Sequence, residues 1–270
     1  VINDVFGLVF NADCGEIVQN GEADDAAMAK LHAPFWTYAK DGKPYTNAAE
    51  LRYVEKYFQI GDYVLNDKNY YYFDKKIPGV DWNPYEKVLT LKDAKIKATG
   101  ENIGLRSLLS EEVSIILKGD NVIEAEGIGL LNDMNVMHLY SEDGKGKLSI
   151  VSTTDKGIKN NRAFFISNCK LDITAEQEAF YNTSGLQMEN CEATFTGKHG
   201  GYIGDETSVL FFPRYTSLTC TGSEVDGVVY PSCRGYNANF FSSIELLTPG
   251  YVLTHSSLSP EFWVEKSATG

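Results

Sequence analysis

The densest group of ionisable side chains beside a glycine turn lies late in the chain. Lys198 and His199 precede Gly200-Gly201, and the acidic pair Asp205-Glu206 follows. A histidine with nearby carboxylates is typical of general acid–base catalysis, in which one group protonates a leaving oxygen and another activates the nucleophile. The structural alternative is a polar turn in which the glycines permit a sharp corner.

Basic and acidic residues in the same part of the chain suggest a second chemistry. A polysaccharide lyase abstracts a proton with Arg or Lys, while Ca2+ held by carboxylates neutralises the uronate of its acidic substrate. The residues of these types are Arg214, Arg234, Asp205, Glu206, Glu224 and Asp226. Their carboxylates lack calcium-loop spacing, so we expect no metal or other cofactor, with Ca2+ used only if the chain is a lyase. If the chain is an enzyme, we expect His199, Asp205 and Arg214 to carry the reaction; otherwise we expect no catalytic residues.

Tyrosines are the candidates for a binding site without catalysis. Sugar rings stack their C–H faces on exposed Tyr or Trp, and polar neighbours bind the hydroxyl groups. The tyrosines expected near successive corners of the fold, and therefore expected to bind a glycan, are Tyr181, Tyr202, Tyr230 and Tyr236. The alternative is that these rings stack on one another or pack a cap against the rest of the protein.

Composition limits the classes of partner and fold. The 270 residues carry 24 Lys and Arg against 37 Asp and Glu, and a net charge of −13 opposes binding to nucleic acid or to an anionic membrane. No run of about 18 apolar residues occurs, so we expect no transmembrane segment. The five cysteines have no CxxC spacing and are odd in number, which predicts neither a zinc site nor a complete disulfide framework: Cys14, Cys169, Cys191, Cys220 and Cys233. At least one thiol is free, and we expect buried cysteines to act as small apolar side chains.

Six short segments of alternating character repeat through the middle of the chain. They begin at Ile96, Ile123, Ile150, Ile173, Ala193 and Leu218, at separations of 27, 27, 23, 20 and 25 residues. The alternation predicts strands with one apolar and one polar face. A repeat of this length with two or three short strands is the size of one turn of a parallel β-helix, so we expect about six turns.

A second ladder pairs a glycine with a following aliphatic residue. Its members are Gly104-Leu105, Gly129-Leu130, Gly157-Ile158, Gly185-Leu186 and Gly227-Val228, with Gly201 and Ile203 between the last two. We expect the glycines to turn the corners with positive φ and the aliphatic residues to fill the core. Asn168-Cys169 also matches Asn190-Cys191 at a separation of 22, which leaves the register open at this step. In that register the two cysteines stack in the core and the asparagines form an amide ladder.

Both flanks of the repeat region are expected to cap it, because the ends of a β-helix present unpaired strand edges. Asn47 and Glu50 form a capping box that predicts a helix, and 24–31 predicts a second helix with acidic residues at its N-terminus. The apolar face of the first helix comprises Leu51, Val54 and Phe58. The predicted regions are an N-terminal capping region with short helices (1–86), a parallel β-helix (87–235) and a C-terminal capping segment (236–270).

Three segments resemble a known family: 88–100 (VLTLKDAKIKATG), 113–130 (VSIILKGDNVIEAEGIGL) and 146–158 (GKLSIVSTTDKGI). They are similar to repeats of secreted or surface-attached bacterial proteins with carbohydrate-binding domains, in the pectate-lyase-like superfamily, over roughly 86–235. The resemblance implies an all-β fold, a right-handed single-stranded parallel β-helix with a small helical N-terminal cap. It also implies a secreted, cell-surface or periplasmic setting, although the opening VINDVFGLVF lacks the basic start of an export signal. Residues 198–201 resemble the glycine-flanked histidine of polygalacturonases, without their Asn-Thr-Asp motif.

The expected function is therefore a glycan-binding or surface-interaction module without catalysis of its own. One alternative is a polysaccharide lyase or glycoside hydrolase that acts in a groove along the later turns. A second alternative is an adhesin-like scaffold for protein partners at the cell surface.

Overall fold

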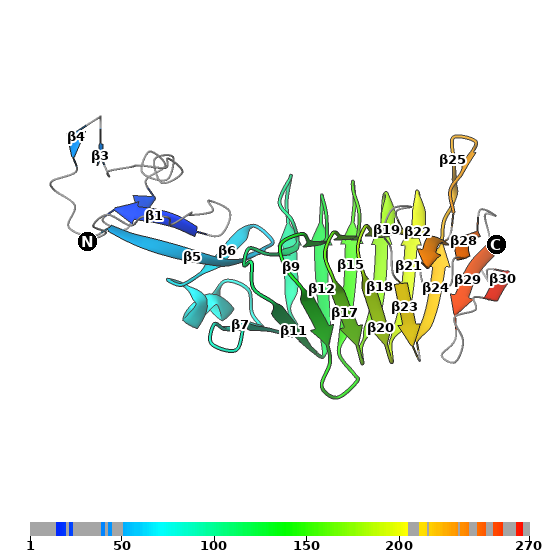
Figure 1. Cartoon of the computed structure of the whole chain (residues 1–270), viewed down its shortest axis with the longest axis horizontal. Helices are drawn as coiled ribbons and strands as arrows, with labels where there is room; N and C mark the ends of the chain where they lie inside the picture. Colours follow the sequence, from blue (N-terminus) through cyan, green and yellow to red (C-terminus); the bar gives the residue numbers. More distant parts are fainter. Residues whose placement is uncertain are drawn as a thin grey trace.

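The computed structural model describes residues 55–204, 216–231 and 233–234 with their side chains. It describes the backbone alone for the strand residues 15–19, 22–23, 39–40, 43–44, 51–54, 211–214, 235–237, 242–246, 251–255 and 263–266. Over this part of the chain the structure is almost entirely β (Figure 1).

Three sheets of parallel strands form the body of the protein. Sheet I contains β9 (Lys95–Ala98), β12 (Asp120–Ala125), β15 (Lys147–Ser152), β18 (Lys170–Ala175), β21 (Glu192–Gly197) and β24 (Ser217–Thr221). Sheet II contains β10 (Leu105–Ser107), β13 (Leu130–Asn132), β16 (Ile158–Asn160), β19 (Glu178–Asn182), β22 (Gly200–Gly204) and β27 (Cys233–Asn237). Sheet III contains β8 (Val88–Lys92), β11 (Val113–Lys118), β14 (Met137–Tyr140), β17 (Phe164–Ser167), β20 (Leu186–Glu189) and β23 (Phe211–Arg214).

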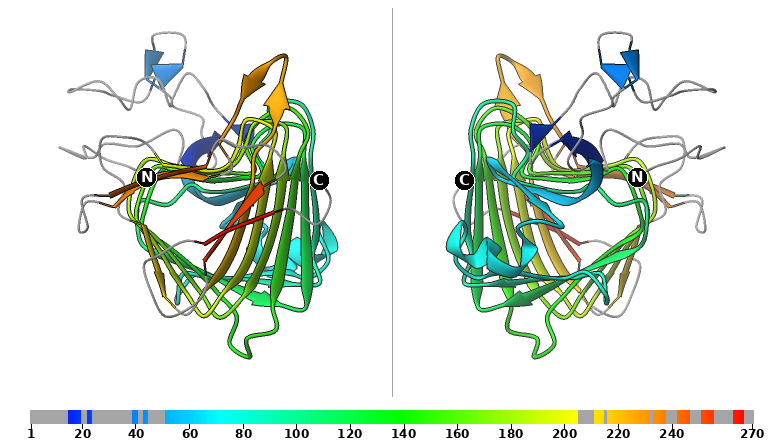
Figure 2. Two further views of the ribbon diagram at one scale, coloured as in Figure 1. Left: turned by 90° about the vertical axis from the view of Figure 1, so that its right-hand side faces the viewer. Right: turned by 90° about the vertical axis from the view of Figure 1, so that its left-hand side faces the viewer.

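The chain visits the sheets in the order I, II, III and then returns to sheet I one strand further along. Figure 2 shows the resulting coil along its axis, with the three sheets around a common core. The six parallel strands of sheet I correspond to about five turns, fewer than the six predicted. The prediction of an all-β parallel solenoid is confirmed.

The inward positions of sheet I form a continuous column, with one correction to the predicted register. Ile96, Ile123, Ile150 and Ile173 follow one another as predicted, but the next members are Phe195 and Cys220, while Ala193 pairs with Leu171. The 22-residue register is therefore the observed one at this step, and the 20-residue register is wrong.

The corner between sheets III and I explains this register. Asn168 and Asn190 both have positive φ there, and the Asn190 Nδ2 donates to the Asn168 Oδ1 at 3.2 Å. Cys169 and Cys191 follow them and are buried, at 2% and 3% exposure. The amide ladder and the stacked apolar cysteines of the alternative register are both confirmed.

The glycine ladder is confirmed for three of its members, but not for the expected reason. Gly104, Gly129 and Gly157 precede the inward residues of β10, β13 and β16, and none of them has positive φ. A Cβ on Gly129 would overlap the Ile150 side chain and lie 2.6 Å from the Gly157 carbonyl oxygen. Glycine is required here because the neighbouring turn approaches too closely for any side chain.

The last members of that ladder lie elsewhere. Gly185 precedes β20 of sheet III, and Gly227 lies in the hairpin of β25 (Glu224–Val225) and β26 (Val228–Val229). In sheet II the inward column continues instead through Phe180, Tyr202 and Cys233.

A ladder of buried asparagines runs inside the solenoid at the end of the sheet II strands. The Asn132 Nδ2 donates to the Asn160 Oδ1 at 2.8 Å, and the Asn160 Nδ2 donates to the Asn182 Oδ1 at 2.7 Å. The Asn182 Nδ2 ends the ladder by donating to the Tyr202 hydroxyl at 3.0 Å. Identical residues on successive turns thereby satisfy polar groups in the core.

Antiparallel strands precede the coil where helices were predicted. β5 (Leu51–Ile60) pairs with β6 (Tyr63–Asn66) and with β10, and β7 (Val80–Asn83) pairs with β8. The helix predicted from the capping box is therefore wrong, because Leu51, Val54 and Phe58 belong to a strand. The region does contain a 3-10 helix, η1 (Tyr70–Lys75), while residues 24–31 lie outside the described residues.

Further strands lie near the two ends of the sequence. Towards the N-terminus these are β1 (Gly15–Gln19), β2 (Glu22–Ala23), β3 (Ala39–Lys40) and β4 (Lys43–Pro44). Towards the C-terminus β28 (Ser242–Leu246) pairs antiparallel with β27, β29 (Tyr251–His255) with β24, and β30 (Trp263–Lys266) with β29. Within the described part of the chain, no helix has the length and hydropathy needed to span a bilayer.

Candidate functional site

The corner between sheets I and II carries polar and aromatic side chains on successive turns, and we call it the corner strip. It comprises Glu126, Ser152, Thr154, Asp155, Lys156, Glu176, Gln177, Glu178, Lys198, His199 and Tyr230. The strip exists because each connection from a sheet I strand to a sheet II strand lies over the connection of the turn before. Backbone hydrogen bonds join these connections, such as Thr154 N to Glu126 O at 2.9 Å and His199 N to Gln177 O at 3.2 Å.

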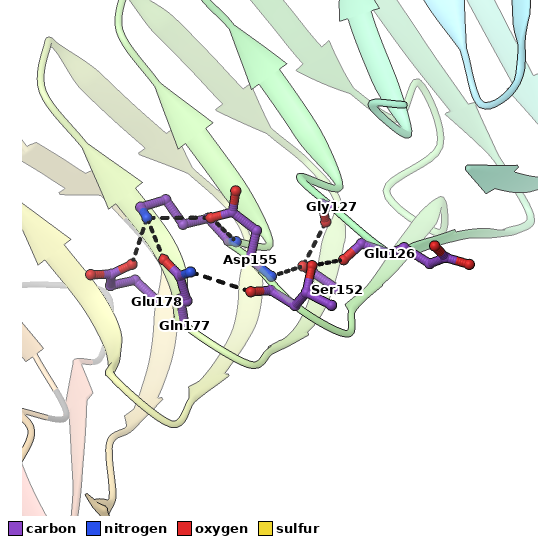
Figure 3. Close-up of polar contacts among 8 residues, drawn as sticks. Glu126, Gly127, Ser152, Asp155, Gln177 and Glu178 are labelled. Atoms are coloured by element: carbon purple, nitrogen blue, oxygen red, sulfur yellow. Dashed lines mark hydrogen bonds and ion pairs between the residues drawn. The ribbon is translucent and has the colours of Figure 1, made fainter. Parts of the chain in front are cut away.

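Lys156 lies at the centre of the strip, with its side chain only 18% exposed. Its Nζ lies 2.7 Å from the Gln177 Oε1, 3.1 Å from the Glu178 Oε2 and 3.4 Å from the Asp155 Oδ1 (Figure 3). Three acceptors thus surround the three N–H groups of the ammonium. Lys156 is a fixed positive charge that holds two carboxylates and an amide in place.

Hydrogen bonds to the backbone fix the neighbouring side chains. The Ser152 hydroxyl donates to the Gly127 carbonyl at 2.7 Å, and the Thr154 hydroxyl donates to the Glu126 carbonyl at 2.5 Å (Figure 3). The Gln177 Nε2 donates to the Thr154 carbonyl at 3.2 Å. The polar groups are therefore held by the solenoid backbone itself, which reduces the entropy that a ligand would lose by ordering them.

Tyr181 lies beside this group on the outer face of sheet II. The Lys156 Nζ is 5.5 Å from the centre of its ring, within the range of a cation–π interaction. Its strand neighbours are Lys159 on one side and Ile203 on the other, and its ring is partly buried. Tyr181 thus places a partly exposed aromatic ring beside a positively charged ammonium and negatively charged carboxylates that can form hydrogen bonds.

His199 and Tyr230 continue the strip on the later turns. Their rings stack with centres 4.4 Å apart and planes at 27°, and the Lys198 Nζ pairs with the Glu176 Oε1 at 2.6 Å. The β25–β26 hairpin projects from the solenoid directly before Tyr230, as Figures 1 and 2 show from two directions. Among the described residues, no carboxylate pairs with His199, whose ring instead serves as a stacking partner.

The other predicted site residues do not join this group. Tyr202 has no exposed surface and ends the internal asparagine ladder, so the surface position expected for it is corrected. Burial raises the pKa of the Tyr202 hydroxyl well above its usual range. Tyr236 of β27 and Arg214 of β23 are positions at which only the backbone is described, and Asp205 lies outside the described residues. The catalytic set of His199, Asp205 and Arg214 stays a prediction.

Of the acidic residues proposed for calcium, Asp205 and Glu206 lie outside the described residues. Glu224 and Asp226 lie on the exposed hairpin. Where side chains are described, no group of three or more His, Cys, Asp or Glu residues could hold a metal ion.

Sequence reasoning missed a second set of aromatic rings, on the outer face of sheet III. The His138 and Phe165 rings stack with centres 4.9 Å apart and planes at 12°, and the His138 Nε2 lies 2.7 Å from the Glu112 Oε1. Phe165 is 37% exposed, and Tyr140 lies next to His138 on the same face. The alternation in MHLY (137–140) and FFIS (164–167) carried the signal, since it directs Met137 and Phe164 inward and their successors outward.

The fold and the corner strip together define a parallel β-solenoid with a preorganised polar and aromatic edge. No protein-family model, curated protein or solved structure matches this chain.

Proposed function

We propose that this protein is a glycan-binding module of the bacterial cell surface or exterior, a right-handed parallel β-helix that binds a polysaccharide along its corner strip. The observation that carries the proposal is the arrangement around Tyr181, where an aromatic ring adjoins a fixed ammonium, a fixed amide and two fixed carboxylates. Aromatic surface beside preorganised donors and acceptors is the usual chemistry of sugar recognition.

The charges of the strip favour a neutral glycan. Asp155 and Glu178 place two carboxylates beside the single ammonium of Lys156, and Glu126 lies on the preceding turn. A polyuronate would meet this local negative charge as well as the net charge of −13. The carboxylates, by contrast, can accept hydrogen bonds from the hydroxyl groups of an uncharged sugar.

The repeating geometry favours a chain rather than a single sugar. Tyr181 and Tyr230 both lie beside connections of the same corner, on turns separated along the solenoid axis. Successive turns rise by about 4.8 Å, the spacing of neighbouring strands. Sugar units of one polysaccharide can therefore contact several turns at once. Several weak contacts made by one chain together raise its overall affinity.

The direct test measures binding and cleavage together. The 270-residue chain is incubated with neutral and acidic polysaccharides in the presence of Ca2+, and retained glycan and released oligosaccharide are both quantified. Retention of a neutral glycan without release is the expected result. Release of oligosaccharide would favour the lyase or hydrolase alternative, with His199, Asp205 and Arg214 as the residues to replace. If neither retention nor release is detected, the result would favour the protein-scaffold alternative.

Two matched variants locate the site. Tyr181→Ala should weaken binding about tenfold, because it removes the ring between the polar groups of the strip. Phe165→Ala removes an exposed ring on a different sheet and should leave affinity unchanged. If Phe165→Ala weakens binding and Tyr181→Ala does not, the glycan binds on sheet III and the corner strip is a structural feature.

A further inference from the structure

The four cysteines with described side chains form two pairs in the core, although the odd cysteine count gave no sign of pairing. Cys169 and Cys191 lie one above the other on adjacent turns, and Cys220 of β24 and Cys233 of β27 face the core from sheets I and II on the last turn. All four are almost completely buried, at 0–3% exposure, and all four are reduced in this structure. This inference does not depend on the proposed glycan site.

The first pair has a backbone geometry suited to a disulfide bond. Lys170 pairs with Glu192 in the parallel ladder, and the Glu192 N–H donates to the Cys169 carbonyl at 3.2 Å, so the two cysteines occupy equivalent positions. Neighbouring strands lie about 4.8 Å apart, within the roughly 4.4–6.8 Å between Cα atoms that a disulfide spans. The residue before each cysteine has positive φ, so both side chains leave the same kind of corner.

The turns on either side of this pair supply no competing thiol. The Cys191 Sγ lies 3.2 Å from the Glu189 carbonyl oxygen and 3.7 Å from the Ile166 carbonyl oxygen, inside the corner. The ladder places Gly146 at the equivalent position one turn before the pair and Thr216 at the position one turn after it. Neither of these residues carries a thiol, so Cys169 and Cys191 are each other's partners at this corner.

The second pair lies across the corner between sheets I and II, whereas the first pair joins two adjacent turns. Cys220 and Cys233 are 13 residues apart, and the segment between them contains the β25–β26 hairpin and Tyr230. Cys220 follows the buried Phe195 in the ladder of sheet I, and Cys233 follows the buried Tyr202 in the ladder of sheet II. A bond here would fix the base of the hairpin to the last turn of the coil.

We propose that Cys169–Cys191 and Cys220–Cys233 are disulfide-forming pairs that cross-link the later turns of the solenoid under oxidising conditions. The oxidant is a small-molecule disulfide. One cysteine thiolate attacks a sulfur of the oxidant and releases one thiol; the second cysteine thiolate then displaces the other half as a second thiol. Each pair loses two protons and two electrons, and one oxidant disulfide is reduced to two thiols. Because the sulfurs are buried, the reaction takes place during folding or local opening of the corner.

The test is oxidative refolding of the 270-residue chain. The protein is refolded with a mixture of reduced and oxidised glutathione, its free thiols are alkylated in denaturant, and linked peptides are mapped by mass spectrometry. We expect the Cys169–Cys191 and Cys220–Cys233 linkages, with Cys14 the alkylated cysteine of the five. Alkylation of all five cysteines, or linkages that join the two pairs to each other or to Cys14, would overturn the proposal.

A variant and a melt give independent readouts. Cys191→Ala should add Cys169 to the alkylated thiols and leave the Cys220–Cys233 linkage intact. The oxidised wild-type protein should melt roughly 5–10 °C above the same protein after reduction, because the cross-links restrict the unfolded chain. If the variant does not fold, the linkage map of the wild-type protein still decides the question.

Discussion

At the scale of single residues, Tyr202 was predicted to lie on the surface but lies in the core. The segment GGYIG directs Tyr202 into the core and Ile203 outward, the reverse of what side-chain polarity predicts. The reason is the asparagine ladder, which needs a final acceptor for the amide of Asn182. A tyrosine supplies that acceptor and also fills the core against Phe180, whose ring centre lies 5.9 Å from its own.

Tyr202→Phe should therefore reduce the free energy of unfolding by about 1–2 kcal/mol. The ring remains, but the Asn182 N–H loses its acceptor in a site without water contact. Urea denaturation at neutral pH measures the change. Tyr181→Phe is the control, since its partly exposed ring should tolerate the loss of a hydroxyl with little effect, and equal losses in both variants would contradict the role given to Tyr202.

Tyr57 should make the protein sensitive to alkali. Burial, together with the nearby charges of Glu55 and Asp67, raises the pKa of Tyr57 to about 12, from about 10 in an unfolded chain. A phenol with a raised pKa in the folded state adds stability below pH 10, and this contribution is lost as the pH rises from about 10 towards 12. The urea midpoint of the wild-type protein should fall between pH 9 and pH 11, and the fall should be smaller in Tyr57→Phe. Identical falls in the two proteins would rule out Tyr57 as a source of the alkaline sensitivity.

At the scale of elements, the strands of sheet I were predictable and the elements before them were not. Alternation and repeat length identify the sheet I strands, because each strand has one face in the core and one in solvent. The capping box at Asn47 and Glu50 is a local signal, whereas β5 is determined by antiparallel pairing with β10, which places Phe58 and Ile60 in the core. Pairing partners distant in sequence thus override local helix signals.

The candidate site was only partly predictable for a related reason. Tyr181, Tyr230 and His199 were recognised from residue type, and the structure places all three along one corner or its adjoining sheet. Lys156 and Gln177 were missed because their role depends on which turn connections overlie each other. That relation follows from the register, which the sequence left open between Cys169 and Cys191.

A pair of glycine substitutions tests the close approach of adjacent turns. Gly129→Ala should destabilise the protein by about 1–3 kcal/mol, because the new Cβ overlaps Ile150 and the next turn has no space to move. Gly185→Ala should change stability by less than about 0.5 kcal/mol, since no atom lies within 4 Å of a Cβ at that position and its φ is not positive. Chemical denaturation of both variants gives the comparison. If Gly185→Ala is as damaging as Gly129→Ala, the glycines act through backbone conformation and not through lack of space.

At the scale of the whole molecule, both ends of the solenoid meet strands of the opposite direction. β5 and β7 pair antiparallel with the first strands of sheets II and III, and β28 and β29 pair antiparallel with the last strands of sheets II and I. A parallel stack can otherwise extend without limit, because each exposed edge is a template for a further strand. Antiparallel strands occupy these edges and interrupt the repeat that a second solenoid would have to match.

Removal of the C-terminal strands should therefore convert the protein to an associating form. A chain that ends after residue 237 lacks β28, β29 and β30, which exposes the edges of β24 and β27. For the truncated chain, sedimentation velocity should show larger species whose amount increases with protein concentration. Over the same range of concentrations, the sedimentation distribution of the full chain should not change. Loss of β30 alone, which pairs with β29 and not with the solenoid, should leave the distribution as in the full chain. A truncated chain that remains as dispersed as the full chain would show that the antiparallel strands are not what limits edge-to-edge association.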